Sequence, residues 1–156
     1  SSIREIWWDI RPHPGYGTVE IRVCDSIPDL INIRDLAALI QALVVGLCNH
    51  YDNGTHLPYL DSWIIHENKW RATRYGMEAK LIIDEDGNEE DIKSIIKSTI
   101  SALEPEINDL NVGHAMDKLL DRINSNHSYY NDQIQLYEKD TSFKKLIKDN
   151  IEKLKK

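Results

Sequence analysis

The fold is decided by two apolar stretches near the N-terminus, Glu5-Ile6-Trp7-Trp8-Asp9-Ile10 and Thr18-Val19-Glu20-Ile21-Arg22-Val23-Cys24. In the second stretch apolar residues alternate with polar ones, and this period of two indicates a strand with one apolar and one polar face. The first stretch belongs to an apolar run from Ile3 to Ile10 and predicts a buried strand. The segment 11–17 contains two prolines and two glycines, so we expect the strands to pair antiparallel through a loop.

Two helices are expected after these strands. Asn32 is the predicted N-cap of the first, with Asp35 three residues on and Gly54 as its stop. This helix has few polar side chains, which predicts burial on most sides and packing against the sheet. A second and more polar helix is expected over residues 62–75, ended by Gly76.

The rest of the chain has a helical pattern. After a solvated turn over 84–88, apolar stripes with helical spacing occupy residues 92–100, 119–123 and 143–154. We therefore expect residues 1–83 to hold two strands and two helices, with residues 84–156 as a helical region packed on them. The fold class is α+β.

Composition excludes several classes of protein. A net charge of −7 over 156 residues makes binding to nucleic acid an unlikely default, because phosphate backbones attract basic surfaces. No uninterrupted apolar run reaches the roughly 18 residues of a membrane span, and no basic segment followed by an apolar one opens the chain. We expect a cytoplasmic protein that does not enter a membrane, and we interpret Cys24 and Cys48 as reduced core thiols.

One group of candidate functional residues lies on the two predicted strands. Arg11 follows the first strand, and alternation places Glu20 and Arg22 on the same face of the second. Glutamate oxygen is a hard ligand suited to Mg²⁺, and the planar guanidinium group of arginine matches phosphate or carboxylate. The alternative is a solvent-facing sheet with cross-strand Glu–Arg pairs, which spacing alone does not exclude.

A second group lies on the predicted polar helix. Arg71 and Arg74 are three residues apart and share a face with Asn68, so they could reach a phosphate. The alternative is a solvated amphipathic face. A zinc-protease motif is excluded, since the second histidine of HExxH would have to stand where Trp70 does.

Two segments resemble signatures of the type 2 glutamate–cysteine ligases, a family of carboxylate–amine ligases. They are Trp7-Trp8-Asp9-Ile10-Arg11-Pro12-His13-Pro14 with Gly17-Thr18-Val19-Glu20-Ile21-Arg22-Val23-Cys24-Asp25, and Glu67-Asn68-Lys69-Trp70-Arg71-Ala72 with Arg74-Tyr75-Gly76. The resemblance implies part of a glutamine synthetase-like antiparallel sheet whose concave face holds ATP and divalent metal ions. It also implies that this chain is the C-terminal half of such an enzyme, without the N-terminal motifs.

The resemblance implies roles for both groups. Glu20 would bind Mg²⁺, and Arg11 and Arg22 would contact the transferred phosphoryl group or the substrate carboxylate. Asn68, Arg71 and Arg74 are second choices, as contacts to the cofactor, since their motif could equally be structural.

The implied reaction activates the side-chain carboxylate of glutamate as an acyl phosphate, using ATP, before the amine of cysteine or of another substrate displaces phosphate. The partners we expect are the missing N-terminal half or further copies of the chain, and the chain alone should be inactive. Two alternatives stay open: a non-catalytic binding or assembly module, and a phosphotransferase of the same fold superfamily. The segment 124–130 departs from the family pattern, where a small, Arg-containing segment is expected.

Overall fold

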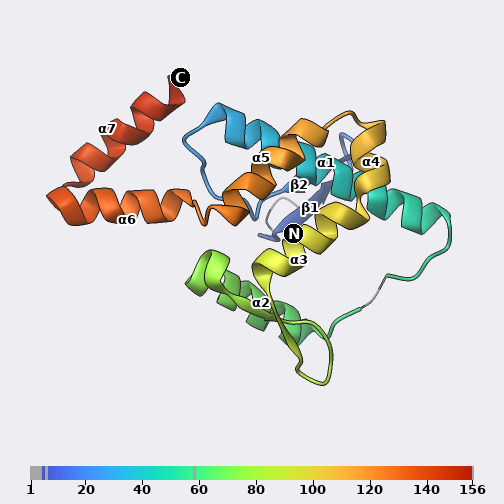
Figure 1. The fold of residues 1–156 in the computed structure, drawn as a ribbon. Helices are drawn as coiled ribbons and strands as arrows, with labels where there is room; N and C mark the ends of the chain where they lie inside the picture. The colour runs from blue at the N-terminus through green and yellow to red at the C-terminus, as the bar shows by residue number, and fades with distance from the viewer. Residues whose placement is uncertain (1–4, 6, 58, 156) are drawn as a thin grey trace.

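The computed structural model describes residues 5, 7–57 and 59–155, and within them the chain forms two small antiparallel sheets and seven α-helices (Figure 1). The predicted α+β class is confirmed. In chain order the elements are β1 (Ile10–His13), β2 (Thr18–Ile21), α1 (Leu30–Asp52), α2 (Ser62–Tyr75), the 3₁₀ helix η2 (Gly76–Glu78), β3 (Lys80–Ile82), β4 (Glu89–Asp91), α3 (Ile92–Ala102), α4 (Glu104–Asp109), α5 (Gly113–Asn124), α6 (Tyr129–Asp140) and α7 (Phe143–Leu154).

The predicted antiparallel pairing of the N-terminal strands is confirmed, but the first strand lies later in the chain than predicted. β1 begins at Ile10 and runs through Pro12, which a two-stranded sheet tolerates because a strand edge needs no donor there. Trp7 lies before β1 with 83% of its surface exposed, so the prediction of a buried strand over this stretch is wrong. Ile3 and Ile6, which belonged to that prediction, lie outside the described residues.

The N-cap of helix α1 lies three residues earlier than predicted. Asp29 is the N-cap, and its carboxylate accepts hydrogen bonds from the backbone amides of Ile31 (2.9 Å) and Asn32 (3.1 Å). The prediction of Asn32 as the cap is therefore wrong, and Asn32 is instead buried inside the helix. A local sequence rule could not separate the two, because both residues are good caps and both precede apolar positions.

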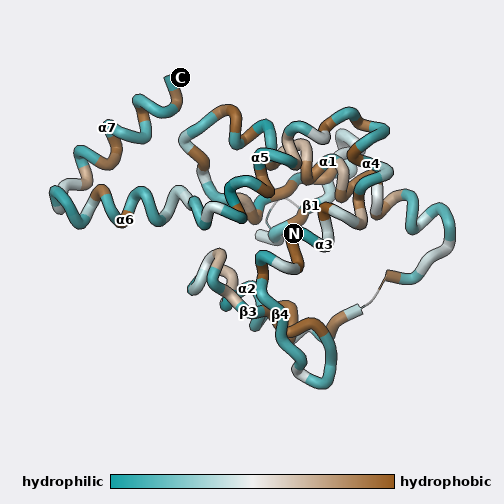
Figure 2. The backbone as a smooth tube through the Cα atoms, viewed as in Figure 1, coloured by the Kyte–Doolittle hydropathy of each residue, from teal (hydrophilic) through white to brown (hydrophobic). Residues whose placement is uncertain are grey.

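The expectation that α1 is buried on most sides against the sheet is also wrong. One stripe of the helix, including Ala38, Ala42 and Gly46, is buried, and α1 packs mainly on α5 and α4. Other apolar side chains such as Val44 and Leu47 are exposed, and they colour much of this helix brown in Figure 2. By length and composition alone α1 could span a membrane, a test that core helices of soluble proteins also pass.

The core is built from four helices. Small residues of α1, Ala38 and Ala42, cluster with buried apolar side chains of α3, α4, α5 and the α3–α4 junction, which are Ile100, Leu103, Ile107, Ala115 and Met116. Gly46 lets α1 approach closely, since a Cβ atom at this position would lie 2.7 Å from a methyl carbon of Leu103. The predicted stripes of α3 and α5 thus face this core.

A second hairpin, β3–β4, was not anticipated from the sequence. Its turn falls in the predicted solvated segment, where the carboxylate of Asp84 accepts hydrogen bonds from the backbone and side chain of Asn88 and Gly87 has a positive φ of 82°. Helix α2 packs on β3. The predicted bounds of α2 are confirmed, with Gly76 at its C-cap and a φ of 55°.

Helix α6 extends away from the core, and α7 turns back at an angle to it on the same side of the molecule (Figure 1). The apolar stripe of α7, which includes Phe143 and Ile147, is exposed in this chain. Cys24 and Cys48 are free and exposed, so their interpretation as core thiols is wrong. Cys24 lies beyond the end of β2, and Cys48 lies near the C-terminal end of α1.

Candidate functional site

The first candidate group meets on the β1–β2 hairpin. Arg11 and Glu20 are directly opposite each other in the antiparallel register. Arg11 donates from Nε to Oε2 of Glu20 at 2.8 Å, and Arg22 donates from Nη1 to Oε1 at 3.1 Å. Each carboxylate oxygen of Glu20 therefore receives a guanidinium group, and the predicted shared face of these residues is confirmed.

This cluster is partly open to solvent. The hydrogen bond from Arg11 lowers the pKa of the Glu20 carboxyl against the opposing effect of burial, and Arg22 lowers it further. The guanidinium group of Arg22 also lies 4.8 Å from the ring centre of Trp7. Two guanidinium groups thus contact one carboxylate, and guanidinium groups match the geometry of a phosphate or carboxylate.

Helix α2 is joined to this hairpin by an ion pair that the sequence did not reveal. Lys69 donates from Nζ to both carboxylate oxygens of Asp9, at 2.6 and 2.8 Å. The two residues are 60 positions apart, and no local pattern links them. The contact brings the two predicted groups onto neighbouring elements.

Arg71 is the most highly connected residue of the second group. It donates to the carboxylates of Glu67 (2.8 Å) and Glu89 (2.6 Å) and to the backbone carbonyl of Lys80 (3.1 Å). The bond to Glu67, followed by the bond to Glu89, raises the pKa of Arg71. Arg71 also lines a polar cavity of about 340 Å³ whose other walls are Glu67, Trp70, Tyr75, Glu78 and Lys80.

The other two predicted residues of α2 have different surroundings. The side-chain amide of Asn68 donates to the carbonyl of Ile82 and accepts from its N–H, both at 2.8 Å. It therefore occupies the edge of β3 as a neighbouring strand would. Arg74 is exposed in the last turn of α2, with its guanidinium carbon 5.7 Å from the ring centre of Tyr75. The proposed cofactor roles of both residues stay predictions.

Within residues 5, 7–57 and 59–155, no three His, Cys, Asp or Glu side chains come together as metal ligands. Glu20 can supply oxygen to a divalent ion, but one carboxylate between two arginines is not a metal site by itself. The arginines themselves fit a phosphate or carboxylate group better.

The family model and the individual relatives that match this chain point to the same protein family. The model of glutamate–cysteine ligase family 2 matches residues 1–149. A protein of Thermobifida fusca named "Putative glutamate--cysteine ligase 2" is 41% identical over 129 residues, which are 83% of this chain and 32% of that protein. A protein of the same name from Bdellovibrio bacteriovorus is 34% identical over 146 residues, which are 94% of this chain and 38% of that protein. The chain thus spans about a third of the length of these curated relatives.

Proposed function

Because the chain belongs to glutamate–cysteine ligase family 2, we propose that it forms part of an ATP-dependent carboxylate–amine ligase that makes an amide through an acyl phosphate. Glutamate and cysteine are the default substrates, with another amine as the close alternative. The observation that carries the proposal is the hairpin cluster, where Arg11 and Arg22 converge on Glu20 inside a segment that the family model matches.

The chemistry of the cluster fits the proposed reaction. Transfer of a phosphoryl group from ATP to a carboxylate concentrates negative charge, and the protein's main task is to position the reactants and neutralise that charge. Arginine does this without losing its proton, and its planar fork can contact two oxygens at once. We assign Arg11 and Arg22 to the phosphoryl group or to the substrate carboxylate.

For Mg²⁺ the described residues fit only in part. We propose Glu20 as one oxygen ligand, with the remaining ligands supplied by parts of the family's length that this chain does not span. A bound ion would neutralise charge on the phosphates. Mg²⁺ would compete with Arg11 and Arg22 for the carboxylate of Glu20. Binding of the ion would therefore be coupled to breaking of the Glu20 ion pairs.

On α2, Arg71 is the stronger candidate for a contact to nucleotide phosphate, since it lines the polar cavity beside Trp70. Arg74 is a second candidate from the same face. Asn68 is a weaker one because its amide is bonded to Ile82 and it does not line the cavity.

The chain alone should show negligible ligation, because it spans about a third of its relatives. We propose that activity needs the remainder of the family fold, or further copies of the chain, and that the protein works in the cytoplasm without nucleic acid or membrane. A chimera that joins this chain to the remaining part of the Thermobifida fusca relative provides the test. Robust turnover by the isolated chain would contradict the proposal of a partial site.

The second candidate function is a non-catalytic module in which Glu20 only holds the hairpin together. The closed arrangement of Glu20 between two arginines favours it. In the chimera, Glu20→Gln and Arg22→Lys decide between the two. A catalytic role predicts loss of Mg²⁺-dependent ATP turnover in a chimera that stays folded, whereas the module predicts a lower melting temperature and the same turnover.

A further inference from the structure

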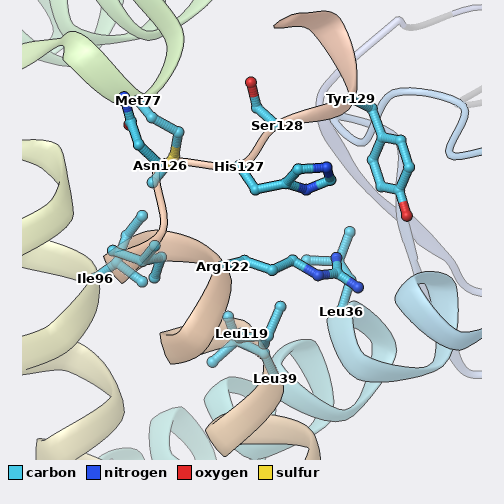
Figure 3. A pocket seen from close by; sticks show the side chains of 11 residues that line it. Leu36, Leu39, Met77, Ile96, Leu119, Arg122, Asn126, His127, Ser128 and Tyr129 are labelled. Atoms are coloured by element: carbon cyan, nitrogen blue, oxygen red, sulfur yellow. The ribbon is translucent and has the colours of Figure 1, made fainter. Parts of the chain in front are cut away.

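A second cavity lies on the helical side of the molecule, away from the residues of the candidate site. It has a volume of about 270 Å³ and is bounded by α1, η2, α3, α5, the segment between α5 and α6, and the start of α6 (Figure 3). Its lining residues are Leu36, Leu39, Met77, Ile96, Leu119, Arg122, Ile123, Asn126, His127, Ser128 and Tyr129. None of these lies on the β1–β2 hairpin or on α2, so the cavity is separate from the proposed ligase residues.

The wall of the cavity is apolar, with one charged group. Leucine and isoleucine side chains from α1, α3 and α5 line most of it. In Figure 3 the side chain of Arg122 reaches across the cavity toward Leu36 and Tyr129. A ligand here would need an apolar body and a group that satisfies a guanidinium.

Arg122 has no anionic partner among the described residues. The contact recorded for its guanidinium group is the ring of Tyr129, whose centre is 5.9 Å from Cζ. The side chain is partly buried, and a guanidinium has five N–H donors that need acceptors. Guanidinium donors without hydrogen-bond acceptors in an apolar wall are energetically unfavourable. A bound anion would accept hydrogen bonds from them.

The rim beside Arg122 is held in place by its own contacts. The hydroxyl of Tyr129 donates to Oδ2 of Asp29 at 3.1 Å, and the same carboxylate caps α1. Burial, together with this hydrogen bond, raises the pKa of Tyr129 to about 12. His127 pairs with Asp132 at 3.2 Å. Both neighbouring carboxylates are thus already engaged.

A second cation lies near the rim of the cavity. Nζ of Lys153, on α7, lies 5.8 Å from the ring centre of Tyr129, but it forms an ion pair with Asp149 at 2.9 Å. Arg122 is thus the cation at this end of the cavity that has no carboxylate partner among the described residues.

We propose that this cavity binds a small monocarboxylate with an apolar body, whose carboxylate pairs with Arg122 and whose hydrocarbon part contacts Leu36, Leu39 and Leu119. The charge of Arg122 selects an acid over a neutral molecule of the same shape. The site is independent of the proposed ligase function, since it uses neither the hairpin nor α2.

The experiment titrates this chain, labelled in its Leu and Ile methyl groups, with hexanoate and with hexan-1-ol. The methyl signals of Leu39, Ile96 and Leu119 should shift with hexanoate. Hexanoate should bind about tenfold or more tightly than hexan-1-ol, because a charge-assisted pair with arginine adds about 1.4 kcal/mol or more. Equal binding of the two probes, or no methyl shifts with either, would overturn the proposal.

Variants of α5 supply the controls. Arg122→Gln should remove the preference for hexanoate while leaving binding of hexan-1-ol in place. Lys118→Gln removes an exposed cation one turn earlier on the same helix, outside the cavity lining, and should change neither affinity. Arg122 also stands in the last turn of α5, where a cation favours the helix end. If Arg122→Gln only lowered the melting temperature and kept the tenfold preference, this structural role would be the correct one.

Discussion

Replacement of Asn68 by Ala should destabilise the fold through the edge of β3. The side-chain amide of Asn68 makes two hydrogen bonds of 2.8 Å to the N–H and C=O of Ile82, and Ile82 is only 7% exposed. An alanine would leave both backbone groups without this partner. Each lost partner of a buried group costs about 1–2 kcal/mol, so the expected loss in the free energy of unfolding is about 2–4 kcal/mol.

Urea denaturation, followed by circular dichroism, measures this loss directly. Asn68→Asp keeps the acceptor for the Ile82 N–H but places a carboxylate oxygen against the Ile82 carbonyl, so at neutral pH it should be at least as destabilising as alanine. Thr73→Ala is the matched control on α2, because its exposed hydroxyl bonds only to a carbonyl of the same helix. A loss for Asn68→Ala no larger than that of Thr73→Ala would refute the structural role and favour the cofactor role.

Three further predictions concern the core, pH dependence and the link between hairpin and α2. Ile100→Ala should lower the free energy of unfolding by about 2–4 kcal/mol, because Ile100 lies in the helical core. Ile147→Ala, on the exposed face of α7, should lower it by less than about 0.5 kcal/mol. Similar values for the two variants in urea denaturation would contradict this placement. Arg11 holds the pKa of Glu20 in the folded state below its usual 4.5, so the stabilisation from this ion pair is complete above pH 4.5 and is lost as the pH falls through the folded-state pKa. Glu20→Gln should therefore flatten the acid side of a plot of melting temperature against pH. An unchanged acid slope would count against the pair. Asp9 and Lys69 are each about half exposed, so a double-mutant cycle of Asp9→Ala and Lys69→Ala should give a coupling energy below about 1 kcal/mol. A larger value would show that this ion pair is shielded from solvent.

Local patterns predicted those parts of the fold that depend on neighbouring residues. Alternation in the second strand placed Glu20 and Arg22 on one face, and the structure joins both to Arg11. The bounds of α2 followed from its polarity and from Gly76. These features are encoded by residues close together in the sequence, so a periodic pattern is enough to find them.

Features set by distant contacts escaped prediction. The Lys69–Asp9 pair and the support of β3 by Asn68 depend on how elements pack, which periodicity does not report. The apolar face of α1 predicted burial on most sides, but only the stripe with Ala42 is covered by α4 and α5. Arg122 gave no sequence signal, since a single arginine near the end of an amphipathic helix usually serves as a helix cap or a surface charge.

The most direct test of the proposed function is product analysis of the chimera with glutamate, cysteine, ATP and Mg²⁺. Mass spectrometry should detect the amide of glutamate and cysteine, formed in equal amount with ADP and phosphate, and Glu20→Gln should abolish all three products while the protein stays folded. ATP consumption without any amide would instead identify a phosphotransferase. A folded chimera that neither binds ATP nor consumes it would contradict the assignment of Arg11, Glu20 and Arg22 to catalysis.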